Sequence, residues 1–356
     1  MRRNRGYGFS YREETHRLRN FLVTLLVLLV FGVAFFITTN IIANHSVQLE
    51  TYKITVHNLP RDLENWSILH LSDLHGVRIG EKQASIKEAI ALKNYSCVVI
   101  TGDMLGADQD TAPVLELLDL LPKDKPIFYL PGDEDPPLTT PLAHGSLSVY
   151  SEWAETLQRH GVTFLDEPLS ITRGKSRIWF VPESLYTLDL STMKASYTTQ
   201  LEGLNARAGA LSPDEAAQKR YIEYQLGRID RIAEAKAAIT TKDVQVAVSH
   251  APVTASYLQT MLSWQDKSNA FSLRHAALVL AGHTCGGGWC LPGIGPIYVE
   301  DYGWFPGEAG IRGLHYLSGI AQYVSPGLGT RSSGLFRSRV FNPPTATLLY
   351  LTQQIQ

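Results

Sequence analysis

The chain has 356 residues, of which 44% are hydrophobic and 19% are charged, and its net charge is −2. This composition excludes a globally disordered chain, and the near-neutral charge argues against a general nucleic-acid-binding protein, which is usually basic. The three cysteines, Cys97, Cys285 and Cys290, are too few for a domain held together by disulfides.

Residues 1–20 form a basic tail with six arginines and two glutamates, a net charge of +4. Residues 21–43 follow without a charged side chain, and as a helix they would extend about 34 Å, enough to cross a hydrocarbon core of about 30 Å. We therefore predict a transmembrane anchor at the cell membrane. Because Lys and Arg favour the cytoplasmic side, the tail is expected in the cytoplasm and the C-terminal domain outside it.

Two other interpretations of residues 21–43 were weighed. A cleaved signal peptide has a shorter apolar region and a small-residue cleavage pattern, and no A-x-A pattern follows here. A buried core helix would need a polar face, which this segment lacks. We favour an uncleaved, single-pass anchor, joined to the rest of the chain by a linker at residues 44–50.

Residues 51–356 are predicted to form one α/β domain, because short apolar strands alternate with helices. The expected strands are 51–56, 67–72, 97–103, 126–133, 162–165, 177–181, 244–250 and 276–283, with helices at 82–93, 113–121 and 150–160. Residues 297–299, 314–324 and 345–351 are expected to add further strands. Residues 183–211 are polar and expected to be irregular. Ser212, Pro213 and Glu215 then predict the start of a helix that runs to about residue 239, so an insertion is placed at about 183–240.

Side chains that suit metal binding follow five of these strands, and in α/β sheets ligands gather at the carboxyl ends of strands. They lie in Ser72-Asp73-Leu74-His75, Thr101-Gly102-Asp103, Pro131-Gly132-Asp133-Glu134-Asp135, Ser249-His250 and Gly282-His283-Thr284-Cys285. A single Asp or His after a strand is usually a cap or a turn residue. Five such segments together predict a metal site, because Asp, His and Cys are ligands for zinc, iron and manganese.

The order D-x-H, G-D, G-N-H-[DE], H and G-H-x-H is typical of calcineurin-like metallophosphoesterases, and the chain resembles a divergent member of that family. GHTCGGGWCLPG at 282–293 and LPRDLENWSILHLSDLH at 59–75 are most similar to its bacterial membrane-associated branch. The resemblance implies two β-sheets sandwiched between helices. It also implies hydrolysis of a phosphate mono- or diester by a hydroxide that two divalent metal ions (Mn, Zn or Fe) activate.

The resemblance further implies which residues bind the metal ions. The first ion would be bound by Asp73, His75 and Cys285, and the second by Asp133, His250 and His283, with Asp103 bridging both. Asp103 and Glu134 are the candidate catalytic residues.

Three of these positions depart from the family's pattern, because Asp133 stands at its asparagine and Glu134 and Cys285 stand at two of its histidines. With a Cys285 thiolate, the ligands would carry a charge of about −4 against +4 on two divalent ions, which weakens the field acting on a phosphate. Glu134 replaces an imidazole that acts on the leaving group, and a carboxylate acts as an acid only if its pKa is raised.

Two functions therefore stay open. The first is a membrane-anchored extracytoplasmic phosphohydrolase whose substrate is a phosphate ester, lipid-linked or derived from the cell envelope, with no nucleic acid as partner. The alternative is a catalytically impaired binding module of the same fold, which the changes at Glu134 and Cys285 motivate. A disulfide between Cys285 and Cys290 would compete with metal ligation by Cys285. The aromatic residues Trp289, Tyr302, Trp304 and Phe305 either line a substrate rim or pack inside the domain.

Overall fold

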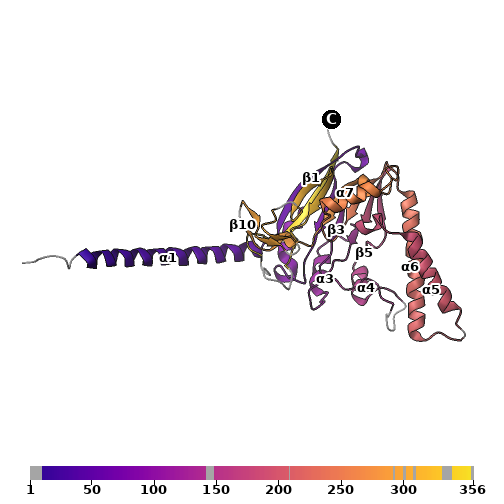
Figure 1. Cartoon of the computed structure of the whole chain (residues 1–356), viewed down its shortest axis with the longest axis horizontal. Coiled ribbons are helices and arrows are strands. Elements are labelled where there is room, and N and C mark those ends of the chain that lie inside the picture. Colours follow the sequence, from indigo (N-terminus) through magenta and orange to yellow (C-terminus); the bar gives the residue numbers. More distant parts are fainter. Residues whose placement is uncertain are drawn as a thin grey trace, which may run out of the picture.

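The structure is a computed structural model that describes residues 10–141, 148–207, 209–291, 293–299, 302–307, 310–330 and 339–353. The first nine residues of the predicted basic tail lie outside this range. Helix α1 (Ser10–Asn44) extends away from an α/β domain (Figure 1). Among the helices described, only the segment His16–Asn44 is long and apolar enough to cross a membrane.

Two six-stranded sheets form the domain. The first has the order β1-β16-β2-β3-β4-β5, and β2 to β5 run parallel. Its strands are β1 (Gln48–Val56), β2 (Trp66–Leu71), β3 (Cys97–Ile100), β4 (Ile127–Tyr129), β5 (Val162–Phe164) and β16 (Thr345–Gln353).

The second sheet has the order β14-β15-β9-β8-β7-β6, and β7, β8, β9 and β15 run parallel. Its strands are β6 (Leu169–Arg173), β7 (Ser176–Pro182), β8 (Val244–Val248), β9 (Ala276–Ala281), β14 (Gly313–Leu317) and β15 (Ile320–Val324). Two short hairpins precede β14. They are formed by β10 (Cys290–Leu291) with β11 (Gly295–Pro296), and by β12 (Tyr298–Val299) with β13 (Gly303–Trp304).

The two sheets pack face to face through apolar side chains such as Ile68 and Phe128 of the first and Phe180 and Leu280 of the second. The helices are α2 (Ala84–Ile90), α3 (Ala112–Leu118), α4 (Glu152–Arg159), α5 (Leu190–Asn205), α6 (Pro213–Ala238) and α7 (Ala255–Trp264). Apolar residues of α2, α3 and α4 cover the outer face of the first sheet, and those of α6 and α7 cover the outer face of the second. The predicted fold class, two sheets between helices preceded by one apolar helix, is confirmed.

The expectation that residues 183–211 are irregular was wrong, because α5 occupies most of this segment. The Asp189 side chain caps α5 by accepting hydrogen bonds from the backbone amides of Ser191 (3.0 Å) and Thr192 (3.1 Å). Lys194 of α5 forms an ion pair of 2.6 Å with Asp230 of α6. The helix forms despite its Ser- and Thr-rich sequence because it packs along α6, and the pair protrudes from the domain at the end far from α1 (Figure 1).

Other boundaries also differ from the expected ones. Strand β6 was not expected, and it pairs antiparallel with β7 at the edge of the second sheet. Residues 314–324 form two strands rather than one, because Ser318 and Gly319 take positive φ and turn the chain. The capping box that was predicted at Ser212 is present at the start of α6. Only residues 45–47 separate α1 from β1, where a linker was expected over 44–50.

Candidate metal centre

Backbone hydrogen bonds join the loops at the carboxyl ends of the central strands. The amide of Asp73, after β2, donates to the carbonyl of Gly102, after β3, over 3.0 Å. The amide of Gly282, after β9, donates to the carbonyl of His250, after β8, over 2.8 Å. The two sheets meet where His250 Nδ1 donates to the carbonyl of Thr101 over 2.7 Å. The Glu134 amide, after β4, donates to Asp103 Oδ1, so all five segments singled out in the sequence converge on one region.

The backbone of this region is held in an unusual conformation. Five of the candidate ligands have positive φ: Asp73 (52°), His75 (50°), Asp103 (51°), His283 (72°) and Cys285 (48°). A residue other than glycine in this region is uncommon, and each such position costs about 1–3 kcal/mol. The surrounding hydrogen bonds hold these residues in place, and such clusters of strain are typical of functional sites.

One group of potential ligands consists of Asp103, His250 and His283, whose ligand atoms all lie within 4.8 Å of one another. Because a carbonyl can only accept, His250 Nδ1 carries a proton, so Nε2 is the nitrogen that would bind an ion once it has lost its own proton. That Nε2 lies 3.1 Å from Asp103 Oδ2 and 3.1 Å from His283 Nδ1. Asp103 Oδ2 is buried and faces the imidazole of His250. This convergence of lone pairs fits a divalent cation.

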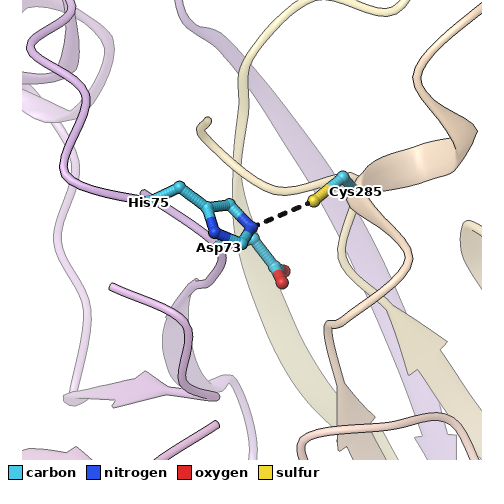
Figure 2. A group of neighbouring side chains, drawn as sticks. All are labelled: Asp73, His75 and Cys285. Carbon is cyan, nitrogen blue, oxygen red and sulfur yellow. Dashed lines mark hydrogen bonds between the residues drawn. The ribbon is translucent and has the colours of Figure 1, made fainter. Parts of the chain in front are cut away.

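The second group consists of Asp73, His75 and Cys285, again with ligand atoms within 4.8 Å of one another. Figure 2 shows the imidazole of His75 directed at the sulfur of Cys285, with the Asp73 carboxylate beside them. The distance from His75 Nε2 to Cys285 Sγ is 3.4 Å. All three residues are buried, so the group is shielded from water. An imidazole, a carboxylate and a thiol form a donor set that suits zinc or iron.

The charges in this region shift the pKa values of both buried histidines upward. Burial lowers the pKa of His75, but hydrogen bonds with Cys285 and Glu134 outweigh it and raise the pKa to about 11. Burial also opposes the charged form of His250, while the hydrogen bond and the charge of Asp103 raise its pKa to about 9. The carboxylates therefore draw positive charge into the site. A metal ion would supply that charge in place of the protons.

The two aspartates that lie inside the groups respond differently to their surroundings. Burial raises the pKa of Asp73. Burial acts in the same direction on Asp103, but the hydrogen bond and charge of His250 outweigh it and lower the pKa. Asp103 is therefore the more firmly ionised of the two carboxyl groups, as a ligand between two cations would need to be.

Asp133 lies at the mouth of the site rather than inside it. Its side chain is 72% exposed, and Oδ2 lies 3.5 Å from His283 Nδ1 and 4.0 Å from His250 Nε2. It is adjacent to the group of Asp103, His250 and His283 but does not belong to the buried set. A ligand role for Asp133 requires its side chain to turn inward.

Glu134 connects the two groups of ligands. Its backbone amide donates to Asp103 Oδ1 over 2.8 Å, and its Oε2 lies 3.0 Å from His75 Nδ1. An ionised carboxylate can only accept, so His75 Nδ1 carries the proton in this pair and Nε2 faces Asp73 and Cys285. Glu134 therefore fixes the orientation of a ligand imidazole, as carboxylates beside metal-bound histidines commonly do.

Asp135 was not predicted as a site residue, yet it holds the loop that carries Asp103. The buried carboxylate accepts hydrogen bonds from the backbone amides of Asp103 (2.9 Å), Met104 (3.1 Å) and Leu105 (3.2 Å). It also accepts from the Gly132 amide and the Tyr129 hydroxyl. The third acidic residue in Gly-Asp-Glu-Asp was the signal for this role, but sequence alone does not separate it from its neighbours.

Arg339 is a second buried residue that supports the site. Its guanidinium donates to the carbonyls of Pro326 (2.6 Å) and Gly329, and Nε donates to the carbonyl of Asn342 (2.6 Å). The loop that it holds packs against the site, because the Gly329 amide donates to the Asp73 carbonyl over 2.6 Å. Burial lowers the pKa of Arg339 to about 10, so it stays charged at neutral pH. Nothing in the local sequence distinguishes this arginine from a surface residue.

The cysteines are all free. Cys290 Sγ faces the carbonyl of Gly286 at 3.4 Å, while the sulfur of Cys285 faces His75. The structure therefore favours Cys285 as a potential ligand over a disulfide with Cys290. Among the aromatic residues near this loop, Trp304 and Phe305 are exposed, so of the two alternatives, packing inside the domain does not hold for these two.

The chain matches one family of known proteins and is similar to several solved structures. The calcineurin-like phosphoesterase family matches residues 67–287. The search among curated proteins gave no match. Similar solved structures include phosphopantetheinyl hydrolase from Mycobacterium tuberculosis, which is 15% identical, with 74% of this chain and 91% of that chain covered and a TM-score of 0.35. Vacuolar protein sorting 29 from Cryptosporidium parvum is 12% identical, with 82% and 87% covered and a TM-score of 0.30.

The family match spans more than half of the chain and contains the segments that hold Asp73, His75, Asp103, Asp133, His250, His283 and Cys285. The fold has the two sheets that the resemblance implied, and two groups of residues that could hold a metal ion lie at their carboxyl ends. The chain belongs to the calcineurin-like phosphoesterase family.

Proposed function

We propose that the chain is a membrane-anchored phosphohydrolase that cleaves a phosphate mono- or diester with the help of two divalent metal ions. The observation that carries the proposal is that Asp103 belongs to two sets of ligand atoms, one with His250 and His283 and one with His75 and Glu134. A carboxylate shared in this way suits a pair of neighbouring cations. When bound, such a pair lowers the pKa of a coordinated water and stabilises charge on the phosphoryl group.

Some residues would bind the two ions, and others hold these ligands in position. Asp73, His75 and Cys285 would hold one ion, and His250 and His283 would hold the other, with Asp103 shared between the two. Asp133 would join the second ion only after its side chain turned inward. The carbonyl of Thr101 fixes the tautomer of His250, and Asp135 fixes the backbone that carries Asp103. These contacts orient the ligand side chains, and partners of this kind strengthen the binding of the metal ion.

Glu134 is a positioning residue in this proposal rather than the acid that protonates the leaving group. Its carboxylate is already engaged with Nδ1 of His75. Protonation of Glu134 would weaken that contact, so acid catalysis and orientation of His75 compete for the same group. The candidate catalytic role of Glu134 inferred from its place in the motif therefore gives way to a role in holding the first ion.

The membrane anchor is part of the same proposal. Helix α1 would hold the domain on the extracytoplasmic side, as the arginines before it favour. A cavity of about 260 Å³ lies between the end of α1 and the loop after His75, lined by Asn44, Arg78 and Gly329 among others. In this arrangement, a phosphate ester that is lipid-linked or derived from the cell envelope would reach the domain without leaving the membrane surface.

The alternative, a binding module with impaired chemistry, is favoured by one observation. Glu134 places a negative charge beside His75 and Asp103, where it would repel a phosphate dianion. The two functions differ in turnover rather than in metal binding, so a single assay separates them.

The test uses the full chain in detergent micelles with Mn²⁺ or Zn²⁺ and a chromogenic phosphate diester. The proposal predicts hydrolysis that Asp103→Asn abolishes and that Asp119→Asn, an exposed aspartate on the surface, leaves unchanged. Bound metal without hydrolysis would reject the enzyme and support the binding module.

A further inference from the structure

The end of α1 is fixed to the segment 339–341 of the domain. The side-chain amides of Asn40 and Asn44 donate to the carbonyl of Arg339 over 3.0 Å and 2.7 Å. The backbone amide of Phe341 donates in return to Asn40 Oδ1 over 3.3 Å. These hydrogen bonds fix the orientation of the domain relative to α1, and they therefore determine which side of the domain faces the membrane.

The position of Phe341 along α1 indicates how deep this part of the domain lies relative to the bilayer. Its ring packs edge-on against Phe36 of α1, with centroids 5.1 Å apart and planes at 81°. Phe36 lies within residues 21–43, the apolar segment that would span the bilayer. If that segment spans, the surface around Phe341 lies at the level of the lipid headgroups and the outer part of the acyl chains.

The two short hairpins are attached to the same segment. Val340 accepts a hydrogen bond from the Cys290 amide over 2.9 Å, and its own amide donates to the carbonyl of Gly288 over 3.1 Å. The second hairpin is joined to the first, because the Ile297 amide donates to the Trp289 carbonyl and the Phe305 amide to the Ile297 carbonyl, both over 2.8 Å. Figure 1 shows β10 beside the domain end of α1.

Large apolar side chains of these hairpins point into solvent. Ile294 is 62% exposed in the turn between β10 and β11, and Trp304 and Phe305 are 61% and 59% exposed at the end of β13. Exposed apolar patches that lie next to one another mark interaction sites, and tryptophan and other aromatic rings are enriched at membrane–water interfaces. Ile294, Trp304 and Phe305 carry no charge, and Glu300 and Asp301, which precede β13 in the sequence, are not part of this set.

We infer that Ile294, in the turn of the first hairpin, and Trp304 and Phe305, at the end of β13 in the second, insert into the outer part of the bilayer that α1 spans, so that the domain is held on the lipid surface at two places. The inference rests on the proposed membrane anchoring. It has a consequence for the metal centre, because Cys285 precedes the first hairpin by only a few residues and the Asn342 side chain donates to the Cys285 carbonyl over 2.8 Å. The site is thereby kept close to the headgroups, and phosphate esters within the membrane are its accessible substrate class.

The test measures lipid contact of single labelled positions in the full chain, reconstituted in phosphatidylcholine–phosphatidylglycerol nanodiscs. Ile294→Cys and, separately, Phe305→Cys carry an environment-sensitive fluorophore, and lipids with a doxyl quencher on the upper acyl chain report contact. Trp264→Cys is the matched control, because Trp264 is 81% exposed on α7, which lies apart from β10 and the end of α1 (Figure 1). Since the three native cysteines are buried, the unsubstituted chain measures background labelling.

We expect blue-shifted emission and strong quenching at positions 294 and 305 and neither at position 264. A label at Phe31→Cys, in the middle of the apolar segment, tests the anchor separately. Quenching at 31 together with aqueous emission at 294 and 305 would overturn the inference while leaving the anchor intact. Absence of quenching at 31 as well would reject the anchor and the inference together, and hydrolysis by the same preparation tests the enzymatic part of the proposal independently.

Discussion

The carboxylate of Asp73 accepts a hydrogen bond of 2.9 Å from the backbone amide of His283. Asp73 follows β2 of the first sheet, and His283 follows β9 of the second. This contact, together with that of His250 with the Thr101 carbonyl, joins the two sheets at their carboxyl ends and sets the spacing between the residues that would hold two different ions. The chemistry of the site therefore depends on how the sheets pack.

Substitution of Glu134 separates a positioning role from an acid role. Glu134→Gln keeps an oxygen that accepts from His75 Nδ1, whereas Glu134→Ala removes it. We expect Glu134→Ala to weaken binding of one metal ion by about 10–100-fold and Glu134→Gln to weaken it far less. Metal titration followed by calorimetry measures both. Full metal affinity with no hydrolysis in Glu134→Gln would instead identify Glu134 as the acid.

Asp135→Asn is expected to destabilise the protein. The carboxylate accepts hydrogen bonds from four backbone amides and the Tyr129 hydroxyl. An Asn side chain has only one acceptor oxygen, and its NH2 group would face some of these N–H and O–H groups without being able to accept from them. Each buried donor left without a partner costs about 1–3 kcal/mol. Denaturant unfolding of the metal-free chain measures the loss. The surface change Asp119→Asn is the control, and equal stability of the two variants would show that Asp135 is not structural.

Gly329→Ala is expected to distort the loop beneath Asp73. A Cβ at this position would lie 2.1 Å from the backbone carbonyl oxygen of Leu74, which cannot move without displacing Asp73 and His75. Gly203→Ala, in α5, has no neighbour within 4 Å and is the matched control. We expect Gly329→Ala to lower metal occupancy and thermal stability and Gly203→Ala to lower neither. Normal occupancy in Gly329→Ala would mean that this loop does not shape the site.

The pH dependence of the metal-free protein follows from His250. Its pKa of about 9 in the folded chain exceeds the ordinary value of 6.5, because Asp103 stabilises the protonated form. This contribution to stability is complete below pH 6.5 and is lost as the pH rises through 9. Metal binding has the opposite dependence, since the ion must displace the proton, so affinity rises from pH 6 to 9. Unfolding of chelated protein and metal titration across this range measure both trends.

The sequence was sufficient to predict the strands that carry the site. Strands β3 and β9 are continuous apolar runs, β8 is interrupted only by Gln245, and Asp or His follows each strand within three residues. The sequence was also sufficient to predict the apolar helix, which has no charge over 23 residues. Helix α5 was missed because its Ser- and Thr-rich sequence has no strong helical preference and is stabilised by α6. The structural roles of Asp135 and Arg339 were not predicted, because they depend on hydrogen bonds with backbone groups elsewhere in the chain. A local sequence pattern does not indicate such contacts.

The most direct test of the account is the number of metal ions bound by the purified full chain. The proposal predicts about two divalent ions per chain in the unsubstituted protein, and loss of both in Asp103→Asn, because Asp103 belongs to the group with His250 and His283 and also lies within 4.8 Å of a ring nitrogen of His75, a residue of the other group. Asn at this position can still accept from the Glu134 amide, so the loss would reflect the missing charge. Asp119→Asn should retain both ions. A chain that binds one ion or none, or an Asp103→Asn variant with full occupancy, would contradict the two-ion centre.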